Sequence, residues 1–204
     1  EHIAAAARAH VRGRLLDIGC GQRPFEGMLL EHAGSYVGLE YDRQRYRLTP
    51  PDIWGSALDL PFRDASFEAV LASQVLEHVP EPEQLFQEVS RILKPGGHLI
   101  LTAPHIWGIH EVPHDYFRFT PYGLEYLARK VALEPLCVRP MAGYWVTVGA
   151  RFCYYLRQFE KIGLAFAMRP CYALVQVVVW GLDRLHRVDS DAWNFALVAR
   201  KIGP

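Results

Sequence analysis

The chain has 204 residues, 50% of them apolar and 22% charged, a composition typical of a globular domain with a sizeable core. Lysine and arginine number 22, as do aspartate and glutamate, so no net charge favours binding to nucleic acid or to an anionic membrane. The cysteines, Cys20, Cys137, Cys153 and Cys171, lack CxxC or CxxH spacing, which argues against a structural zinc site and against a disulfide framework.

The first 13 residues predict an alanine-rich helix with basic residues. They lack the apolar core of a signal peptide. No stretch of about 18 uninterrupted apolar residues marks a membrane-spanning helix. We therefore expect a cytoplasmic protein.

Strand-like and helix-like segments alternate along the first half of the chain. Short runs rich in branched or aromatic residues predict strands at 14–19, 35–40, 52–56, 67–73 and 97–103. Apolar residues at helical spacing predict helices at 25–33 and 81–94, the second ended by the sequence LKPGG (93–97). This alternation predicts an α/β fold with a mainly parallel sheet.

The last third of the chain has a different character. It predicts a helix at 121–132, a strand at 133–141, an apolar helical insertion at 144–188 and a final strand at 191–202, within a single domain spanning 1–204. The second helical segment of the insertion is apolar on nearly every side, so we expect it to be buried. Four roles are open for the insertion: a helical layer over the sheet, a lid over an acceptor pocket, the interface of a homodimer, or a peripheral membrane contact.

A glycine turn follows the first predicted strand in the sequence LLDIGCG (15–21). Glycines at a strand end let the backbone approach a ligand closely, and the next helix offers unpaired N–H groups. Glu40 ends the second strand, at a spacing that suits an acid binding ribose hydroxyls. These features fit a dinucleotide as well as S-adenosylmethionine, but Pro24 occupies the third glycine position of the GxGxxG fingerprint and disfavours a nicotinamide-dependent oxidoreductase.

Two longer motifs distinguish between these cofactors. LDLPFRDASFEAVLASQVLEHV (58–79) and EVSRILKPGGHLILTAPH (88–105) follow the glycine turn in order. With them, the chain closely resembles the small single-domain branch of the class I S-adenosylmethionine-dependent methyltransferases over roughly residues 14–140 and the final strand. The resemblance implies a Rossmann-like sheet of seven strands with helices on both faces.

The resemblance also implies a set of cofactor-binding residues at the strand ends: Asp17, Gly19, Gly21, Glu40, Ser56, Ala57, Leu58, Asp59, Ser73 and Gln74. The first three would surround the methionine end of S-adenosylmethionine, and Glu40 would hold both ribose hydroxyls. Ala57 and Leu58 would border the adenine, with either Ser56 or Asp59 near its amino group. The last two would flank the methionine amino group and the sulfonium. Arg23 replaces the family's usual third glycine, which suggests extra positive charge near the cofactor carboxylate.

The loop after the fifth strand, PHIWGIHEVPHDYFRFT (104–120), is the expected acceptor site. It resembles the HxxPHDYxRxT loop of methyltransferases encoded with glycan and natural-product pathways. The candidate residues for catalysis are His114, Asp115, His110 and His78, and those for substrate binding are His105, Tyr116 and Arg118. We prefer His114 as the base. Asp115 would either orient His114 or contact the substrate. Alternatively, Asp115 and Arg118 form an ion pair that fixes the loop, and His78 is structural.

We expect no metal site. His110 and His114 stand four residues apart, but Pro113 makes a helix between them unfavourable and no third ligand is evident.

The sequence therefore predicts a biosynthetic methyltransferase that moves a methyl group from S-adenosylmethionine to a small molecule, at a hydroxyl of a sugar or secondary metabolite. An N- or C-methyltransferase and a catalytically silent binding subunit are the alternatives. No nucleic-acid partner is expected.

Overall fold

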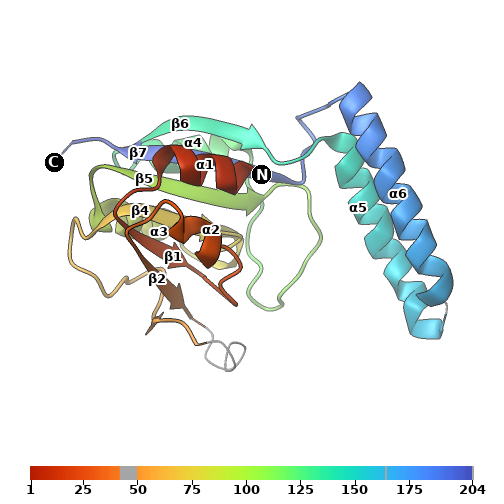
Figure 1. The fold of residues 1–204 in the computed structure, drawn as a ribbon, viewed down its shortest axis with the longest axis horizontal. Helices are drawn as coiled ribbons and strands as arrows, with labels where there is room; N and C mark the ends of the chain where they lie inside the picture. The colour runs from red at the N-terminus through yellow and green to blue at the C-terminus, as the bar shows by residue number, and fades with distance from the viewer. Residues whose placement is uncertain (42–49, 164, 204) are drawn as a thin grey trace. The chain divides into compact units, whose positions relative to one another are not determined.

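The structure, a computed structural model, describes residues 1–41, 50–163 and 165–203, and the chain divides into two compact units (Figure 1). Unit 1 comprises Glu1–Ala103, Ile109–Arg139 and Ala196–Pro204. Unit 2 comprises Pro104–Gly108 and Pro140–Phe195.

A seven-stranded sheet in the order β3-β2-β1-β4-β5-β7-β6 forms the centre of unit 1. Its strands are β1 (Arg14–Ile18), β2 (Ser35–Glu40), β3 (Ile53–Trp54), β4 (Phe67–Ser73), β5 (Leu93–Pro104), β6 (Leu133–Pro140) and β7 (Asn194–Lys201). The strands from β3 to β5 pair in parallel, whereas β7 runs opposite to β5 and β6 (Figure 1). The predicted mainly parallel, Rossmann-like sheet is confirmed.

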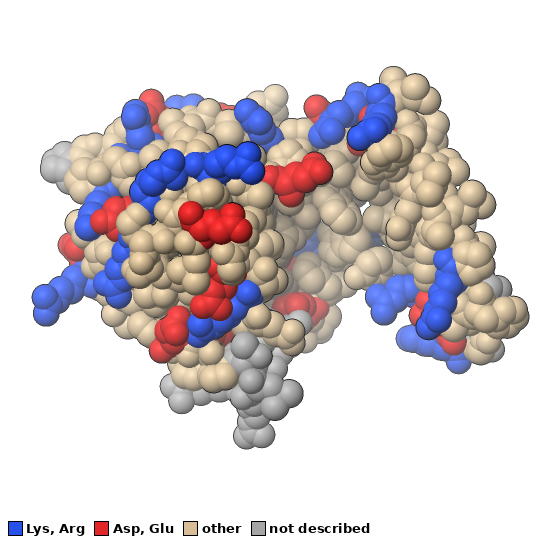
Figure 2. Space-filling view, viewed as in Figure 1, with Lys and Arg blue, Asp and Glu red and all other residues tan. Residues whose placement is uncertain are grey.

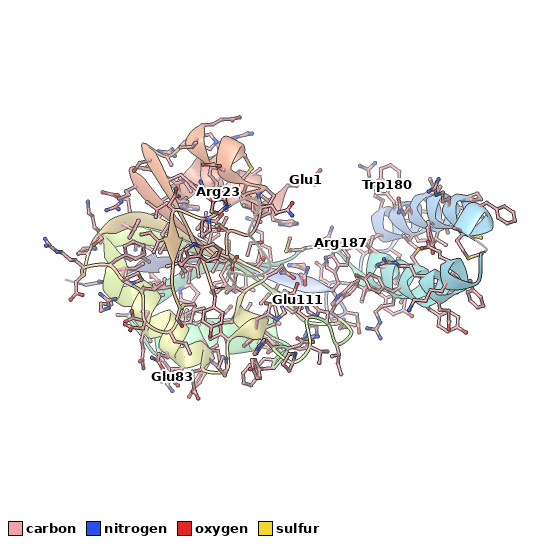
Figure 3. The ribbon with its side chains drawn as sticks, turned by 90° about the horizontal axis from the view of Figure 1, so that it is seen from below. Glu1, Arg23, Glu83, Glu111, Trp180 and Arg187 are labelled. Carbon is pink, nitrogen blue, oxygen red and sulfur yellow. The ribbon has the colours of Figure 1, made fainter. Side chains whose placement is uncertain are left out.

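Helices cover both faces of the sheet, as Figure 3 shows from below. α1 (His2–His10) and α2 (Glu26–Leu30) lie on one face, and α3 (Pro82–Ile92) and α4 (Pro121–Arg129) lie on the other. On the first face, Ile3 and Leu29 join Leu15, Leu71 and Ile100 of the sheet in one buried cluster. Coverage of both faces explains why β1 and β4 are buried along nearly their whole length.

α3 and α4 show how the local sequence sets these helices. In α3 the fully buried residues Leu85, Phe86, Val89 and Ile92 recur at helical spacing and form one apolar face. α4 begins with Pro121, and the Thr120 hydroxyl in front of it accepts the N–H of Gly123 at 3.1 Å.

The observed boundaries differ from the predicted ones at several ends. α3 ends at Ile92 as LKPGG indicates, but β5 begins directly at Leu93 instead of residue 97, because Leu93 already pairs with Phe67. A register shift between Phe67 and Ala69 accommodates the intervening residues. The strand predicted at 52–56 is reduced to Ile53–Trp54.

Unit 2 consists mainly of a helical hairpin. α5 (Tyr144–Leu156) leads through the 3-10 helix η2 (Arg157–Ile162) into α6 (Ala165–Leu185), so both predicted apolar helices are present. α5 approaches α6 closely at Gly149, where an added Cβ would lie 2.6 Å from Val179. At the base of the hairpin, the N–H of Gly143 donates to the Asp183 carboxylate at 3.2 Å.

The prediction that α6 is buried is wrong, because several of its apolar residues are exposed in the single chain. The side chains of Leu174 and Val177 are 65% and 67% exposed, and Figure 2 shows mostly uncharged atoms over this hairpin. Among the helices of the residues that the structure describes, none combines the length and the apolar character of a membrane span.

Candidate functional site

The carboxyl end of β1 carries a tight glycine loop. Gly19 and Gly21 have φ values of +67° and +52°, which glycine adopts without strain. A Cβ on Gly19 would lie 2.4 Å from the side chain of Val75, so no larger residue fits there. The N–H groups of Gly19 and Cys20 donate to the carbonyl of Leu39, which fixes the loop against β2.

Glu40 at the end of β2 joins this loop through its side chain. Its Oε2 accepts the N–H of Gly21 at 3.0 Å, and its Oε1 accepts the N–H of Tyr41 at 2.7 Å. Glu40 is only 8% exposed, and each oxygen retains a lone pair for a further hydrogen bond. The structure thus holds a buried, oriented carboxylate next to the glycine loop.

A cavity of about 430 Å³ opens at this edge of the sheet. Its lining comes from the β1 loop and the end of β4: Asp17, Gly19, Cys20, Gly21, Gln22, Pro24, Phe25 and Ser73. Four of the predicted cofactor-binding residues therefore line one cavity, and Glu40 is bonded to one of them. The volume is in the range of pockets that bind small molecules.

Asp17 is the buried acid of this cavity. Burial raises its pKa to about 7, the hydrogen bond that the Tyr36 hydroxyl donates at 2.7 Å lowers that pKa, and the negative charge of Glu40 raises it. The contact with Tyr36 lay outside the sequence prediction. The parallel pairing of Asp17 with Gly38 on β2 is what brings Tyr36 within reach.

Ser73 and Gln74 are held by Thr102, which the sequence analysis did not identify. The Ser73 hydroxyl lies 3.0 Å from the Thr102 hydroxyl, and the Gln74 side-chain amide donates to the same oxygen at 3.1 Å. Gln74 has a φ of +56°, a strained value for a residue with a side chain. The sequence holds no signal for this contact, because it depends on the register of β4 and β5, in which Ser73 and Thr102 are partners.

The predicted adenine-binding residues Ser56 to Asp59 form one turn after β3. The Ser56 hydroxyl accepts the N–H of Leu58 at 3.1 Å, and its carbonyl accepts the N–H of Asp59 at 3.3 Å. The Leu58 carbonyl accepts from the Gln84 side chain at 2.7 Å. Ser56 thus serves the turn, whereas the Asp59 side chain is exposed.

Arg23, at the position of the missing third glycine, also adopts a left-handed φ of +56°. Its guanidinium bridges Glu26 at 3.2 Å and Asp52 at 3.0 Å. These carboxylates offset its positive charge, and the N–H of Gly38 further fixes Asp52 at 2.7 Å. Arg23 therefore ties the glycine loop to the segment before β3.

The loop after β5 is divided between the two units. His105 belongs to unit 2, where its N–H donates to the Trp193 carbonyl at 2.7 Å and its ring packs on Phe195 at 5.4 Å. The remaining candidates from His110 to Arg118 belong to unit 1. The structure therefore does not group His105 with them.

Asp115 and Arg118 form the ion pair that we considered as the alternative to a catalytic role. The guanidinium donates to both Asp115 oxygens, at 2.6 and 2.8 Å, and the N–H of His110 donates to the same carboxylate at 2.9 Å. The Asp115 side chain is 2% exposed, and the Arg118 hydrogen bonds hold its pKa well below its usual range. The Asp115 carboxylate thus accepts hydrogen bonds from Arg118 and from the loop backbone, and not from the ring of His114.

His114 and His78 lie close together through a backbone contact. Nδ1 of His78 lies 2.5 Å from the carbonyl oxygen of His114, whose own Nδ1 lies 3.1 Å from the Tyr116 hydroxyl. The His78 ring packs edge-on against that of His110, with centroids 4.9 Å apart. Both rings lie beside Glu77, whose burial raises its pKa to about 7. Glu77 is not among the candidate residues that the sequence indicates.

This site lies in the part of the chain that matches known proteins. The family model described as "Methyltransferase domain" matches residues 16–101, which include the glycine loop, Glu40 and Ser73. An uncharacterized methyltransferase of Mycobacterium tuberculosis is 34% identical over 127 residues, covering 56% of this chain and 50% of the relative. The demethylmenaquinone methyltransferase of Listeria monocytogenes is 34% identical over 122 residues, covering 52% of each chain. The chain thus spans about half the length of these curated relatives.

A solved structure supports the same fold. The phosphoethanolamine N-methyltransferase 2 of Haemonchus contortus, in complex with S-adenosyl-L-methionine, superposes with a TM-score of 0.63 at 17% identity. The match covers 99% of this chain and 53% of that chain.

We predict that Asp17→Asn makes the stability of the unliganded protein less sensitive to pH. The folded-state pKa of about 7 exceeds the ordinary aspartate pKa of 3.8, so the wild type loses stability as pH rises from about 4 through 7. Asparagine cannot titrate, and the difference between the two proteins should approach about 4 kcal/mol at most above pH 7. Urea unfolding at pH 5, 6, 7 and 8 measures this.

The exposed Asp59→Asn variant is the control and should keep the wild-type pH dependence. Equal pH slopes for the wild type and Asp17→Asn would contradict the raised pKa.

Proposed function

We infer that the chain is a class I S-adenosylmethionine-dependent methyltransferase, which transfers a methyl group from S-adenosylmethionine to a small-molecule acceptor. The observation that carries this inference is the pairing of a glycine loop with a buried, hydrogen-bonded Glu40 at one edge of the sheet. The name of the Listeria relative gives demethylmenaquinone, a small molecule, as what that enzyme methylates, which supports a small-molecule acceptor.

The residues around the cavity fit this cofactor. When bound, S-adenosylmethionine supplies an electrophilic methyl group on a positively charged sulfur. Gly19 and Gly21 would leave room for the backbone to approach the methionine end, and Asp17 and Ser73 line the same cavity. The pKa of Asp17 is about 7, and a nearby ammonium or sulfonium group would favour its ionised form.

Glu40 would hold the ribose. Its two oxygens are already fixed by the N–H groups of Gly21 and Tyr41, so little reorganisation is needed to accept two neighbouring hydroxyls. For the adenine amino group we now favour Asp59 over Ser56, because the Ser56 hydroxyl is engaged within the turn and Asp59 is exposed. Ala57 and Leu58 would border the base.

The acceptor that we propose is a hydroxyl group of a sugar or secondary metabolite in a biosynthetic reaction. Displacement at the sulfonium requires the acceptor oxygen to be in line with the methyl group, and a hydroxyl must also lose a proton. His114 is the proposed proton acceptor. Asp115 would shape the loop through its ion pair with Arg118, and Tyr116 would contact the acceptor.

The helical hairpin supports a second proposal, that two copies of the chain associate through it. On α6 the exposed side chains Leu174, Val177, Val178 and Leu185 recur at helical spacing, and Gly181 lies within the same stripe. Such a stripe suits packing against another helix better than contact with a flat surface. Basic residues gather near the turn of the hairpin in Figure 2, so membrane contact is the competing outcome.

We predict that Glu40→Ala lowers the affinity for S-adenosylhomocysteine at least 100-fold. Two hydrogen bonds to a buried carboxylate are lost, and each is worth about 1.5–3 kcal/mol. Isothermal titration calorimetry of the full chain measures this, with the exposed Glu31→Ala as the matched control and NADH as a competing ligand. Wild-type affinity in Glu40→Ala, or tighter binding of NADH, would contradict the proposed cofactor.

We predict that His114→Ala lowers kcat by about 10²–10⁴-fold for a hydroxyl acceptor and leaves S-adenosylhomocysteine binding unchanged. The matched control is His32→Ala, outside the loop. Unchanged kcat in His114→Ala would remove the proposed base and favour an amine or carbon acceptor. If the cofactor binds but no acceptor is methylated, the silent-subunit alternative holds.

We predict that the protein is a dimer at tens of micromolar, with a light-scattering mass twice the chain mass of 23.3 kDa. Val177→Asp should make it a monomer, because a charge would be buried in the apolar contact, whereas Leu136→Asp on β6 should not. A wild-type monomer that sediments with anionic lipid vesicles would favour membrane contact instead.

A further inference from the structure

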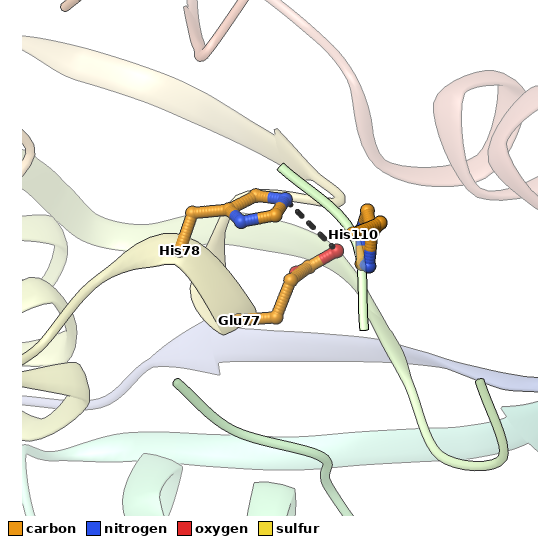
Figure 4. Close-up of side chains that lie close together, drawn as sticks. All are labelled: Glu77, His78 and His110. Atoms are coloured by element: carbon orange, nitrogen blue, oxygen red, sulfur yellow. Dashed lines mark ion pairs between the residues drawn. The ribbon is translucent and has the colours of Figure 1, made fainter. Parts of the chain in front are cut away.

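Glu77, His78 and His110 converge although His110 lies in a different segment of the chain. Glu77 and His78 belong to the short 3-10 helix η1 (Leu76–His78) just after β4, and His110 lies in the loop after β5 (Figure 4). One ring nitrogen of each histidine and one carboxylate oxygen of Glu77 all lie within 4.8 Å of one another. The N–H of Tyr116 donates to the Glu77 carbonyl at 2.8 Å and holds the loop on η1.

The Glu77 carboxylate is the unusual member of this cluster. It is completely buried, and neither of its oxygens has a hydrogen-bond partner in the part of the chain that the structure describes. A buried carboxylate without a partner is strongly destabilising, so such groups are normally hydrogen-bonded, paired or bound to a cation. In Figure 4 the carboxylate points between the two histidine rings.

The histidines are oriented as ligands. The carbonyl of His114, 2.5 Å from Nδ1 of His78, requires the proton on that nitrogen and leaves Nε2 as an electron-pair donor. This Nε2 lies 3.8 Å from Glu77 Oε1 and 3.7 Å from Glu111 Oε2. Asp115 Oδ2 and a guanidinium nitrogen of Arg118 each lie 3.4 Å from Nδ1 of His110, so the ion pair fixes this ring. Carboxylate–histidine contacts of this kind orient imidazoles bound to metals.

We propose that Glu77, His78 and His110 bind one divalent transition-metal ion of the Zn²⁺ class. Two imidazoles and one carboxylate suit Zn²⁺, Mn²⁺ or Fe²⁺, whereas Mg²⁺ and Ca²⁺ prefer oxygen ligands alone. Bonds of about 2.1 Å place tetrahedral ligand atoms about 3.4 Å apart, so side-chain movements on the order of 1 Å would close the cluster on an ion. Glu111 adds a nearby negative charge.

This cluster shares no residue with the proposed cofactor-binding set, and the binding of the ion does not depend on methyl transfer. It differs from the His110–His114 pair that the sequence suggested and that lacked a third ligand. The structure supplies Glu77 and His78 as the further ligands from the segment after β4.

The test is titration of ZnCl₂ into the chelator-treated full chain, without an affinity tag, by isothermal titration calorimetry. We expect one ion per chain with a Kd in the micromolar range or below, and His78→Ala and His110→Ala should each weaken binding at least 100-fold. Co²⁺ should give the visible absorption bands of a four-coordinate site, and these bands should be lost in the same variants. His32→Ala is the matched control and should bind as the wild type does.

Thermal unfolding and S-adenosylhomocysteine binding of each variant show whether it is folded. Folded variants that no longer bind Zn²⁺ but still bind S-adenosylhomocysteine establish the metal site independently of the proposed activity. Because Glu77 is completely buried, the isosteric Glu77→Gln is used for the third ligand. No stoichiometric Zn²⁺ binding by the wild type, or equal binding by wild type and folded His110→Ala, would overturn the proposal.

Discussion

The parallel pairing of β1 between β2 and β4 is the constraint on which the site depends. Parallel strands end at the same edge of a sheet, so residues distant in sequence meet there. Asp17, Glu40 and Ser73 are brought together in this way around the glycine loop. The hydrogen bond from Gly21 to Glu40 then ties the end of β2 to the loop after β1, which makes the loop conformation and the position of the carboxylate mutually dependent.

That edge of the sheet concentrates buried acids. Asp17, Glu40 and Glu77 are 2%, 8% and 0% exposed. Burying a carboxylate is costly, and the protein offsets the cost differently at each one. Asp17 receives the Tyr36 hydroxyl and Glu40 receives two backbone N–H groups, whereas Glu77 has no hydrogen-bond partner among the described residues. An accumulation of incompletely satisfied acids in one region is characteristic of ligand-binding sites more than of a structural core.

In the loop after β5, the ion pair between Asp115 and Arg118 positions other residues of the loop. Asp115 is buried and binds Arg118 through two hydrogen bonds, and it also accepts the backbone N–H of His110. Loss of the Arg118 charge would leave the Asp115 carboxylate, whose side chain is 2% exposed, without its cation. The pair therefore fixes the backbone that carries His110 and His114, while Tyr116 attaches the loop to η1.

The amino-acid sequence by itself determined the alternation of strands and helices, the glycine loop and the acid at the end of β2, because these depend on local periodicity and spacing. It placed the two apolar helices at 144–188 correctly but not their burial, since periodicity shows that a face is apolar without showing what covers it. It also placed β5 four residues too late, because the pairing of Leu93 with Phe67 is a contact between distant segments.

Only the tertiary structure decided which polar groups meet. Thr102 holds Ser73 because β4 and β5 pair in that register. His110 lies with Glu77 and His78 because the loop after β5 folds back onto η1. Side chains converge through strand pairing and loop closure between distant segments, and the spacing of residues along one segment does not contain that information.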